Sequence, residues 1–404
     1  MKTTVVIPTY WGRPAGEPFN PSDVVYDHPT PLDQDGTLSR TLESLTTLDP
    51  NRFDVVIIVG PTHPELAQSA TDKVTEILKT FRPRLDLWLL TPAGVKDLRV
   101  VVTREIGPEI GALIDGYGYS NIRNLCLIAA HLRWADVAVL LDDDEVVEFP
   151  EWLDRAVEFM DSDSGKKRIK TKAGWYKRPD GSYKGPPTRD AWWMKWRGAE
   201  AMNEGFDAVI GRPGRFGPTP FAFGGNMVID RDIFSTVAFD PHLPRGEDID
   251  YVFNTMAAGH EFIMDRELWI RHLPPPSLVP AWLGFRQNAL RFTYARLKLA
   301  SQKPTDVTRI VSLDELMPYP GLFLGDDLDE KIRQTCTLLG QKYVDKQDSV
   351  GYKESMFTIE MVEDLKRREP NPFSRHLEFQ IGWQSLMRWT SDSRFQLSGV
   401  IQAV

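Results

Sequence analysis

The residues VAVLL at 137–141, followed directly by DDDE at 142–145, decide the fold of this chain. Five consecutive apolar residues, rich in β-branched side chains, are typical of a parallel strand that is buried on both faces. The four acidic residues come where that strand must end. In open α/β sheets, ligands bind beyond the carboxyl ends of the strands. The pattern therefore predicts that these carboxylates face a binding crevice.

The crowding of the four acids sets a physical requirement. Two unit charges about 4 Å apart repel by about 4 kcal/mol at an effective dielectric constant of about 20. The cluster therefore requires either full solvation or a bound cation. An acidic cap on the following helix is a weaker interpretation, because that helix is expected over 150–161, several residues downstream. A solvated loop is the remaining alternative.

Length, charge and cysteine content narrow the class of protein. The 404 residues are too many for one ordinary core and predict two domains. A net charge of -9 argues against a general nucleic-acid binder. The only cysteines are Cys126 and Cys336, which form no disulfide framework, so a reducing cytoplasm is expected. The apolar run at the amino terminus is too short for a signal peptide, and none approaches the length of a membrane span.

The segments before the acids alternate between strand and helix patterns. Apolar runs at 5–7, 54–59 and 85–90 predict buried strands, the first ending at Pro8. Alternation of this kind predicts a mostly parallel sheet with right-handed crossovers. The connection at 11–36 is far longer than usual, which indicates a functional loop or a lid.

The segments after the acids contain two ambiguous patterns. Asp180-Gly181, between residues with strand propensity, is a hairpin signal. The cluster WWMKW at 192–196 can line a sugar-binding wall or pack in the core, and both interpretations stay open.

The composition changes after Leu273. Three prolines at 274–276 indicate a hinge, and the remainder is expected to be largely helical. A basic amphipathic helix is expected over 282–300. It can lie on a membrane surface, reach toward phosphates, or pack on its neighbour while its arginines extend to solvent, and packing is the favoured interpretation.

Five features, in family order over about residues 1–275, resemble a GT-A glycosyltransferase, closest to the family 2 pattern. They are VVIPTY at 5–10, Arg123-Asn124, the aspartates at 142–144, GGN at 224–226, and GED at 246–248 with His272 downstream. Each motif alone is weak, whereas the ordered set is fairly specific. The resemblance implies a GT-A (Rossmann-like) nucleotide-sugar-binding and catalytic domain over 1–275, and a helical C-terminal domain over 276–404. That second domain is expected to complete the acceptor side or to mediate self-association.

The resemblance also assigns a donor side. Asp144 is the implied metal ligand, and Asp142 contacts the cation or the ribose of the sugar nucleotide. Asp143 assists, and His272 is a further metal ligand. The alternative for His272 is a histidine that is hydrogen-bonded at a strand end. The donor-binding residues that the resemblance implies are Pro8, Thr9, Tyr10, Arg123, Asn124, Asp142 and Asp143.

The reaction explains why such a site needs a metal. Breaking the anomeric C–O bond leaves negative charge on a nucleoside diphosphate, and a divalent cation stabilises that leaving group as a Lewis acid. Mg²⁺ or Mn²⁺ suits a site dominated by carboxylates, and one imidazole favours Mn²⁺ slightly. A hexose is the expected sugar.

An inverting transfer needs a base for the proton of the acceptor hydroxyl. Asp248 resembles that base, and Glu247 beside it binds acceptor hydroxyls or raises the pKa of Asp248. The alternative is that both acids only complement the dipole of a helix. The acceptor is a small molecule, a glycan or a lipid-linked hydroxyl, and its implied binding residues are Trp193, Gly224, Gly225 and Asn226.

Two departures from the family 2 pattern and two competing classes remain. One departure is Tyr10-Trp11, which replaces the polar residue that is common after the first strand. The residues at 59–63 contain no acid where family 2 members usually read the nucleotide base, so the base is not predicted. Some retaining families share these motifs, which leaves the stereochemistry open. The motif at 142–146 also fits haloacid-dehalogenase-like phosphatases, with Asp142 as nucleophile. Several strands precede it here, whereas that motif ordinarily lies on the first strand. A non-catalytic carbohydrate-binding protein is the third class.

Overall fold

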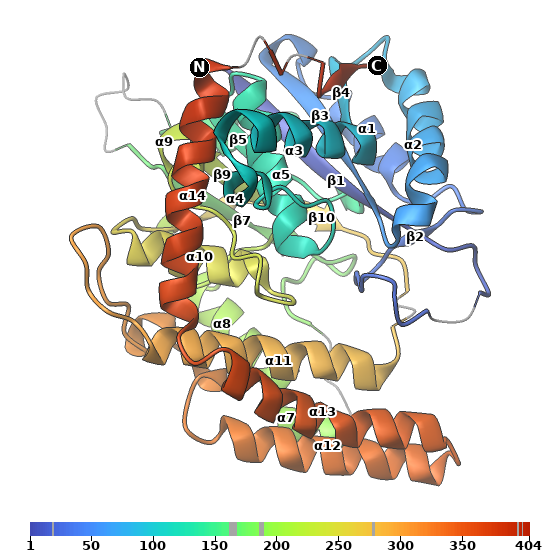
Figure 1. Ribbon diagram of the computed structural model, residues 1–404, viewed down its shortest axis with the longest axis vertical. Helices are drawn as coiled ribbons and strands as arrows, with labels where there is room; N and C mark the ends of the chain where they lie inside the picture. The colour runs from blue at the N-terminus through green and yellow to red at the C-terminus, as the bar shows by residue number, and fades with distance from the viewer. Residues whose placement is uncertain (18–19, 161–167, 186–189, 277–278, 394–395, 398) are drawn as a thin grey trace.

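The computed structural model describes all 404 residues except 18–19, 161–167, 186–189, 277–278, 394–395 and 398. Figure 1 shows a sheet with flanking helices in the upper part of the molecule and a layer of long helices below it. Both termini lie at the top, beside the sheet.

The sheet is mixed, with a parallel centre. Its strand order is β11-β4-β3-β1-β5-β9-β7-β10-β6, with β2 beside β1 and β8 beside β10. Strands β4, β3, β1 and β5 run parallel, and β9 joins the β7–β10 pair to β5 in antiparallel fashion. The bounds are β1 Thr3–Gly12, β2 Thr30–Pro31, β3 Phe53–Pro61, β4 Leu87–Leu90, β5 Val137–Leu140, β6 Glu145–Val146, β7 Thr171–Lys177, β8 Phe216–Pro218, β9 Met227–Asp230, β10 Ile263–His272 and β11 Gln402–Ala403.

Helices cover both faces of the sheet. Along β1, Val5 and Ile7 face one apolar core and Val6 faces the other, because successive side chains of a strand point to opposite faces. Helices α1, α2 and α6 cover the first face, and α3, α5, α10 and α14 cover the second. The bounds are α1 Leu38–Leu45, α2 Ala67–Phe81, α3 Pro92–Ile106, α4 Pro108–Gly111, α5 Tyr119–Leu132, α6 Trp152–Val157, α7 Ala191–Trp196, α8 Gly198–Val209, α9 Arg231–Phe234 and α10 Glu247–Ala257.

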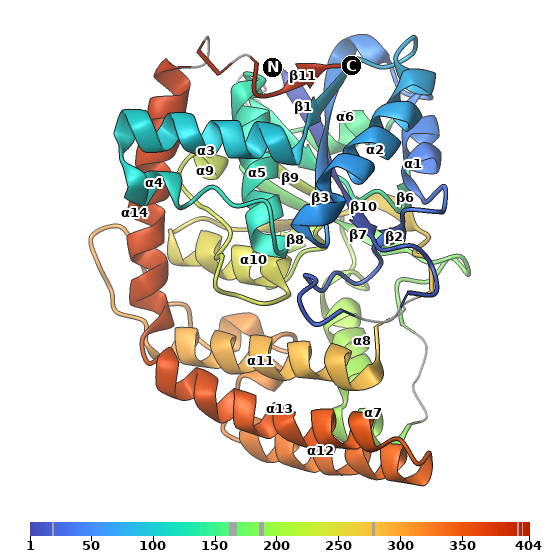
Figure 2. The ribbon, with the colours of Figure 1, turned by 45° about the vertical axis from the view of Figure 1, so that its right-hand side comes forward.

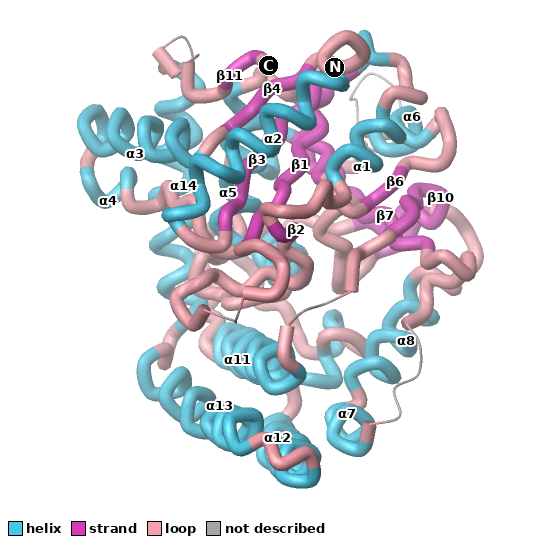
Figure 3. The backbone as a smooth tube through the Cα atoms, turned by 90° about the vertical axis from the view of Figure 1, so that its right-hand side faces the viewer, coloured by secondary structure: helices cyan, strands magenta, loops and turns pink. Residues whose placement is uncertain are grey.

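The C-terminal part is helical, as the sequence predicts, and it returns to the sheet. In Figures 2 and 3, α11 (Ala281–Ala300) lies between the sheet and the pair formed by α12 (Leu328–Asp345) and α13 (Ser349–Arg368). Helix α14 (Pro372–Asp392) then runs back along α5, and β11 pairs with β4. The fully buried Trp383 donates its indole N–H to the carbonyl of Phe234 at 3.0 Å. The predicted C-terminal segment therefore shares the larger apolar core with the helices of the sheet.

Two arginines of the basic helix α11 bond acids of neighbouring helices, which agrees with the interpretation that this helix packs on its neighbours. Arg286 bonds the Glu354 carboxylate at 2.7 Å on α13, and Arg296 bonds Asp329 at 2.8 Å on α12. Within the described residues, no helix is long and apolar enough to cross a membrane.

The first strand is longer than the sequence predicts. Pro8 does not end it, and β1 continues to Gly12. The carbonyl of Val6 accepts a hydrogen bond from Leu141, which shows that alternate residues of β1 direct their backbone groups toward β5. Pro8 is the next residue in that series, and the β5 ladder has already ended there. Its missing N–H therefore costs no ladder hydrogen bond.

Two further predictions after the acids need correction. Helix α6 ends at Val157, well short of the predicted 161, and the ammonium of Lys172 bonds carbonyls of Arg155 and Glu158 at its end. The turn at Asp180-Gly181 forms, but β7 does not pair with a strand beyond it. Strand β10 pairs with residues 175–177, which lie next to the turn, whereas β9 pairs with residues 171–173.

Candidate active site

The acidic loop after β5 is held in place by hydrogen bonds to its own members and to β1. The fully buried Glu145 accepts the backbone N–H of Asp142 at 2.8 Å. The carboxylate of Asp143 accepts the hydroxyl of Thr9 at 2.6 Å, and the hydroxyl of Thr37 also bonds it. Burial and the neighbouring charge of Asp144 raise the pKa of Asp143. These hydrogen bonds tie the side chain of Asp143 to β1 and to the residue before α1, and Asp143 also lines the cleft described below.

Asp144 keeps its charge and faces two imidazoles. Its Oδ2 lies 3.4 Å from Nε2 of His272, the last residue of β10. Burial opposes ionisation, but the hydrogen bond and charge of His272, together with His28, lower the pKa of Asp144. The ring of Tyr176 stacks on His272 with centroids 4.6 Å apart and holds its orientation. The fold thus brings together Asp144 and His272, which lie far apart in the chain.

Arg123 links the two acidic groups of the site. It projects from α5, is buried, and lies 2.8 Å from Oδ1 of Asp142. Its Nε lies 3.4 Å from Oε1 of Glu247. A buried guanidinium between two carboxylates stabilises all three charges only while the geometry is kept. Arg123 therefore positions the loop after β5 against the start of α10.

Glu247 and Asp248 occupy the first turn of α10. The carboxylate of Asp248 accepts backbone N–H groups from Gly224 at 3.1 Å and from Ile249 at 2.8 Å. Burial and the adjacent Asp248 raise the pKa of Glu247 to about 7. Burial also raises the pKa of Asp248. The pair therefore takes up and releases a proton close to neutral pH.

The glycines before β9 allow other groups to approach closely. A Cβ atom at Gly225 would lie 2.3 Å from Oε1 of Glu145, and one at Gly224 would lie 2.5 Å from Nη2 of Arg123. Any side chain at either position would displace a charged group of the site. The backbone N–H of Gly225 instead donates to the hydroxyl of Tyr176 at 2.8 Å.

These groups line one cleft with a volume of about 230 Å³ at the carboxyl ends of β1 and β5. The sequence-predicted residues that line it are Tyr10, Arg123, Asp142, Asp143, Asp144, Gly224, Glu247, Asp248 and His272.

The other predicted site residues do not line the cleft, and most have structural contacts. Pro8 and Thr9 lie within β1, and Gly225 lies behind Tyr176. Asn124 exchanges two hydrogen bonds with the backbone of Phe239. The buried Asn226 lies within reach of backbone carbonyls of β7 and β10.

Trp193 lies on α7, among the C-terminal helices. Its neighbours Trp192 and Trp196 are buried, and Trp196 stacks on Phe323 with centroids 4.7 Å apart. For these two tryptophans, the core alternative that the sequence left open is the observed one. Trp193 is not among the residues that line the cleft.

Several cleft residues escaped the sequence analysis. Asp27 and His28 come from the long 11–36 connection, whose length indicated a function without identifying a residue. Arg245 bonds Asp27 at 2.6 Å, so the loop is tied to the segment before α10. The motif at 246–248 begins directly after Arg245, so it is a weak indication that Arg245 also lies near the site. Tyr119, Tyr176 and Arg291 also line the cleft. The basic pattern over 282–300 included Arg291 and allowed a reach toward phosphates, but it did not place this residue at the site.

The donor set fits a divalent cation that is shared with a substrate. Within the described residues, no group of three or more His, Cys, Asp or Glu side chains is arranged to hold a metal ion. Mg²⁺ is characteristically bound by one or two carboxylates together with substrate phosphates and water. An ionised Asp144 beside His272 matches that requirement, whereas Asp142 is engaged by Arg123. The metal role of these residues stays a prediction.

No family model matches the sequence, and no curated protein matches it. Among solved structures, the chain is similar to the mannosyltransferase PcManGT from Pyrobaculum calidifontis in complex with GDP-Man and Mn²⁺, with 13% identity over 96% of this chain and 86% of that chain, and a TM-score of 0.46. It is also similar to TarS from S. aureus, with 13% identity over 97% and 55% of the two chains and a TM-score of 0.41.

A third similar structure is glucosyl-3-phosphoglycerate synthase from Mycobacterium tuberculosis in complex with Mn²⁺ and UDP-glucose. The identity is 12% over 72% of this chain and 77% of that chain, with a TM-score of 0.37. All three TM-scores lie below 0.5, so the function proposed below rests on the chain's own residues.

Proposed function

We propose that this protein is a metal-dependent glycosyltransferase that moves a sugar from a nucleoside-diphosphate sugar to a hydroxyl acceptor. One observation carries the proposal. An ionised Asp144 beside His272 and the Glu247–Asp248 pair face the same cleft at the carboxyl end of the sheet. One group suits a cation and a leaving diphosphate, and the other suits a hydroxyl that must lose its proton.

On the donor side, Asp144 and His272 hold the divalent cation, Mn²⁺ or Mg²⁺. When bound, that cation neutralises the diphosphate that leaves the sugar. The low pKa of Asp144 keeps its carboxylate available as a ligand at neutral pH. Asp142 contacts the ribose or the cation, and Arg123 fixes its carboxylate at 2.8 Å.

On the acceptor side, Asp248 is the base of an inverting transfer. Its two oxygens each accept one backbone N–H, which fixes their direction and leaves lone pairs for the acceptor hydroxyl. Partial burial raises the pKa of Asp248 toward the range in which a carboxylate accepts a proton efficiently. Glu247, whose pKa is about 7, shares that proton or binds a second acceptor hydroxyl.

The test is a thermal-shift screen of UDP, GDP and their glucose and mannose conjugates, with and without MnCl₂. We expect one nucleotide to raise the Tm only together with the metal, because ligands that bind the native state stabilise it. Asp144→Ala should abolish both that shift and sugar transfer. Asp154→Asn, which changes an exposed acid of α6, is the matched control and should retain both.

Two results would contradict the proposal. A metal-dependent shift of equal size in Asp144→Ala would remove the metal role of Asp144. Release of phosphate from simple phosphomonoesters, dependent on Asp142 and without any sugar acceptor, would instead indicate the phosphatase class.

A further inference from the structure

Arg291 differs from the other arginines of the cleft in its partners. Arg123 lies against Asp142 and Glu247, and Arg245 bonds Asp27. Arg291 makes no ion pair with any of the described residues. Its Nη2 donates to the hydroxyl of Tyr319 at 2.9 Å, and its Nε is buried without a hydrogen-bond partner. A guanidinium cannot be deprotonated in proteins, so this charge, which lies over the ring of Phe292 and bonds no carboxylate of the described residues, is available to an anionic ligand.

The position of Arg291 assigns that ligand to the acceptor side. Arg291 projects from α11 and lines the cleft together with Asp248, and its charge lowers the pKa of Asp248. The aspartates that resemble the donor site lie on the loop after β5, which Arg123 already engages. An anion on Arg291 therefore lies beside the proposed base.

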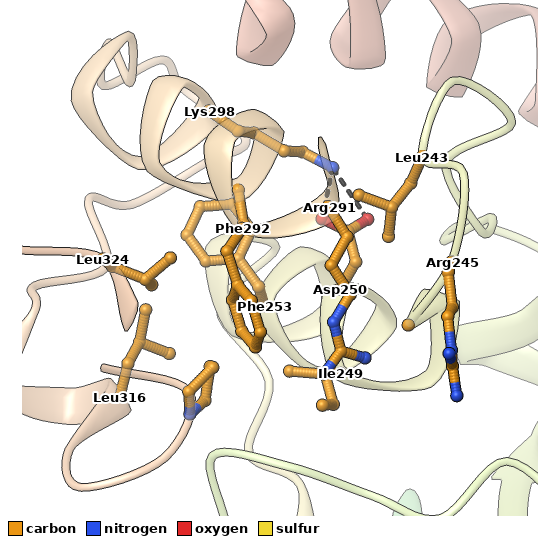
Figure 4. Close-up of a pocket in the computed structure, with 13 residues that line it drawn as sticks. Leu243, Arg245, Ile249, Asp250, Phe253, Arg291, Phe292, Lys298, Leu316 and Leu324 are labelled. Atoms are coloured by element: carbon orange, nitrogen blue, oxygen red, sulfur yellow. Dashed lines mark hydrogen bonds and ion pairs between the residues drawn. The ribbon is translucent and has the colours of Figure 1, made fainter. Parts of the chain in front are cut away.

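A second cavity shares lining residues with the cleft, among them the same arginine. Figure 4 shows the side chains of Arg245 and Arg291 extending in the same direction among the residues that line this pocket. Both arginines line both cavities. Besides the two arginines and the Lys298–Asp250 ion pair, the side chains that line the pocket are apolar, and they are those of Leu243, Ile249, Phe253, Phe292, Ala295, Leu316, Pro320 and Leu324.

The pocket's size limits what can enter it. Its volume is about 40 Å³, whereas a cavity needs at least about 10–15 Å³ to hold a single water. It therefore accommodates a group of a few carbon atoms and excludes a long acyl chain. An apolar wall favours hydrocarbon over a hydrated group.

We propose that the acceptor is a hydroxylated acid that carries a small hydrocarbon group. Its anionic group, a carboxylate or a phosphate, bonds Arg291, and its hydrocarbon enters the pocket between α10 and α11. The hydroxyl between them faces Asp248. This inference rests on the proposed transferase function and specifies its acceptor class, and it makes the C-terminal helix α11 part of the acceptor site.

The experiment is isothermal titration of the full chain, alone and saturated with UDP or GDP plus MnCl₂. The probes are 2-hydroxyisocaproate, the shorter lactate, glycerol 3-phosphate and the neutral 4-methyl-1,2-pentanediol. We expect 2-hydroxyisocaproate or glycerol 3-phosphate to bind at least about tenfold more weakly to Arg291→Gln, because a charge-assisted hydrogen bond is lost. Binding of the neutral diol should not change. If Arg291→Gln weakens the binding of only one of the two anions, that result identifies whether the acceptor carries a carboxylate or a phosphate.

Two further variants separate the pocket from the charge. Ala295→Phe should fill the pocket and weaken 2-hydroxyisocaproate while leaving lactate unchanged. Arg296→Gln, on the same helix but bonded to Asp329, is the matched control and should bind every probe as the wild type does.

Two outcomes would overturn the inference. One is equal affinity of wild type and Arg291→Gln for all anionic probes. The other is loss of nucleotide binding in Arg291→Gln with hydroxy-acid binding unchanged, which would assign Arg291 to the donor diphosphate. Nucleotide binding that needs Asp144 is measured separately, so either outcome leaves the proposed function standing.

Discussion

Helix α10 carries three carboxylates in its first turn, and the surroundings of Asp250 differ from those of the other two. Asp250 points into the protein, where the ammonium of Lys298 lies 2.8 Å from its Oδ2 and 2.7 Å from Asp240. Asn254 and Tyr294 complete the hydrogen bonds of the two aspartates. Glu247 and Asp248 instead face the cleft.

The two groups differ in how completely their charges are satisfied. Burial and the charge of Lys298 lower the pKa of His376 to about 3, so it stays neutral and Lys298 is the facing cation for Asp240 and Asp250. In the cleft, Asp248 meets backbone N–H groups, and Glu247 shares Arg123 with Asp142. Burial raises the pKa of Asp250 as well, but both of its oxygens bond Lys298, so it joins α10 to α11, whereas Asp248 forms no ion pair with any of the described residues. The first residues of α10 therefore carry the acids of the proposed site, whereas Asp250 joins α10 to α11 through Lys298.

The largest expected effect concerns Asp248, the proposed base in the cleft. Asp248→Asn removes the base but keeps the shape of the side chain. We expect kcat to fall by about 100- to 10,000-fold, with binding of nucleotide and metal unchanged. Steady-state kinetics and nucleotide titration of the same preparation check this. An unchanged kcat would transfer the role of base to another group.

The next largest effect concerns the buried network of Lys298, Asp240 and Asp250. Lys298→Met leaves two buried aspartates without their cation, which should lower the free energy of unfolding by about 3–5 kcal/mol. Urea denaturation followed by circular dichroism measures it. Adding Asp250→Asn to that variant should recover part of the loss, because one buried charge is then removed. A loss below about 1 kcal/mol would mean that water reaches the network.

The pH dependence of transfer gives a smaller effect. Because burial raises the pKa of Glu247 to about 7 and also raises that of Asp248, the pair gains a proton as the pH falls. A protonated base cannot accept the acceptor proton, so kcat/KM should fall by up to about tenfold per pH unit below pH 7. Glu247→Gln should move the inflection to lower pH, since Asp248 then loses its neighbouring like charge. A flat profile between pH 5.5 and 8 contradicts the assignment.

The smallest effect comes from an ion pair of α11 that solvent reaches. Arg296 and Asp329 have side chains that are 18% and 30% exposed, against 1% for Lys298. Arg296→Gln should therefore cost no more than about 1 kcal/mol of stability. The same urea titration applies, and a loss as large as that of Lys298→Met would show that burial does not separate the two pairs.

Much of the fold followed from local pattern. The apolar run at 137–141 is buried β5 and its continuation, and the acids after it line a cleft. The helix that begins at Glu247 and the helical C-terminal part also form as expected. The misjudged features, Pro8 and the turn at Asp180-Gly181, depended on which strands lie alongside.

The chain order alone determined which acids come at strand and helix ends, because burial periodicity and turn chemistry are local properties. It could not separate Asp143, bonded inward to Thr9, from Asp144, which faces His272. Nor could it place Arg291 beside Asp248, since that contact needs α11 to fold back beneath the sheet. The interaction energy of two charges depends on their separation and on the effective dielectric constant around them. Both are set by residues that come together only in the folded protein.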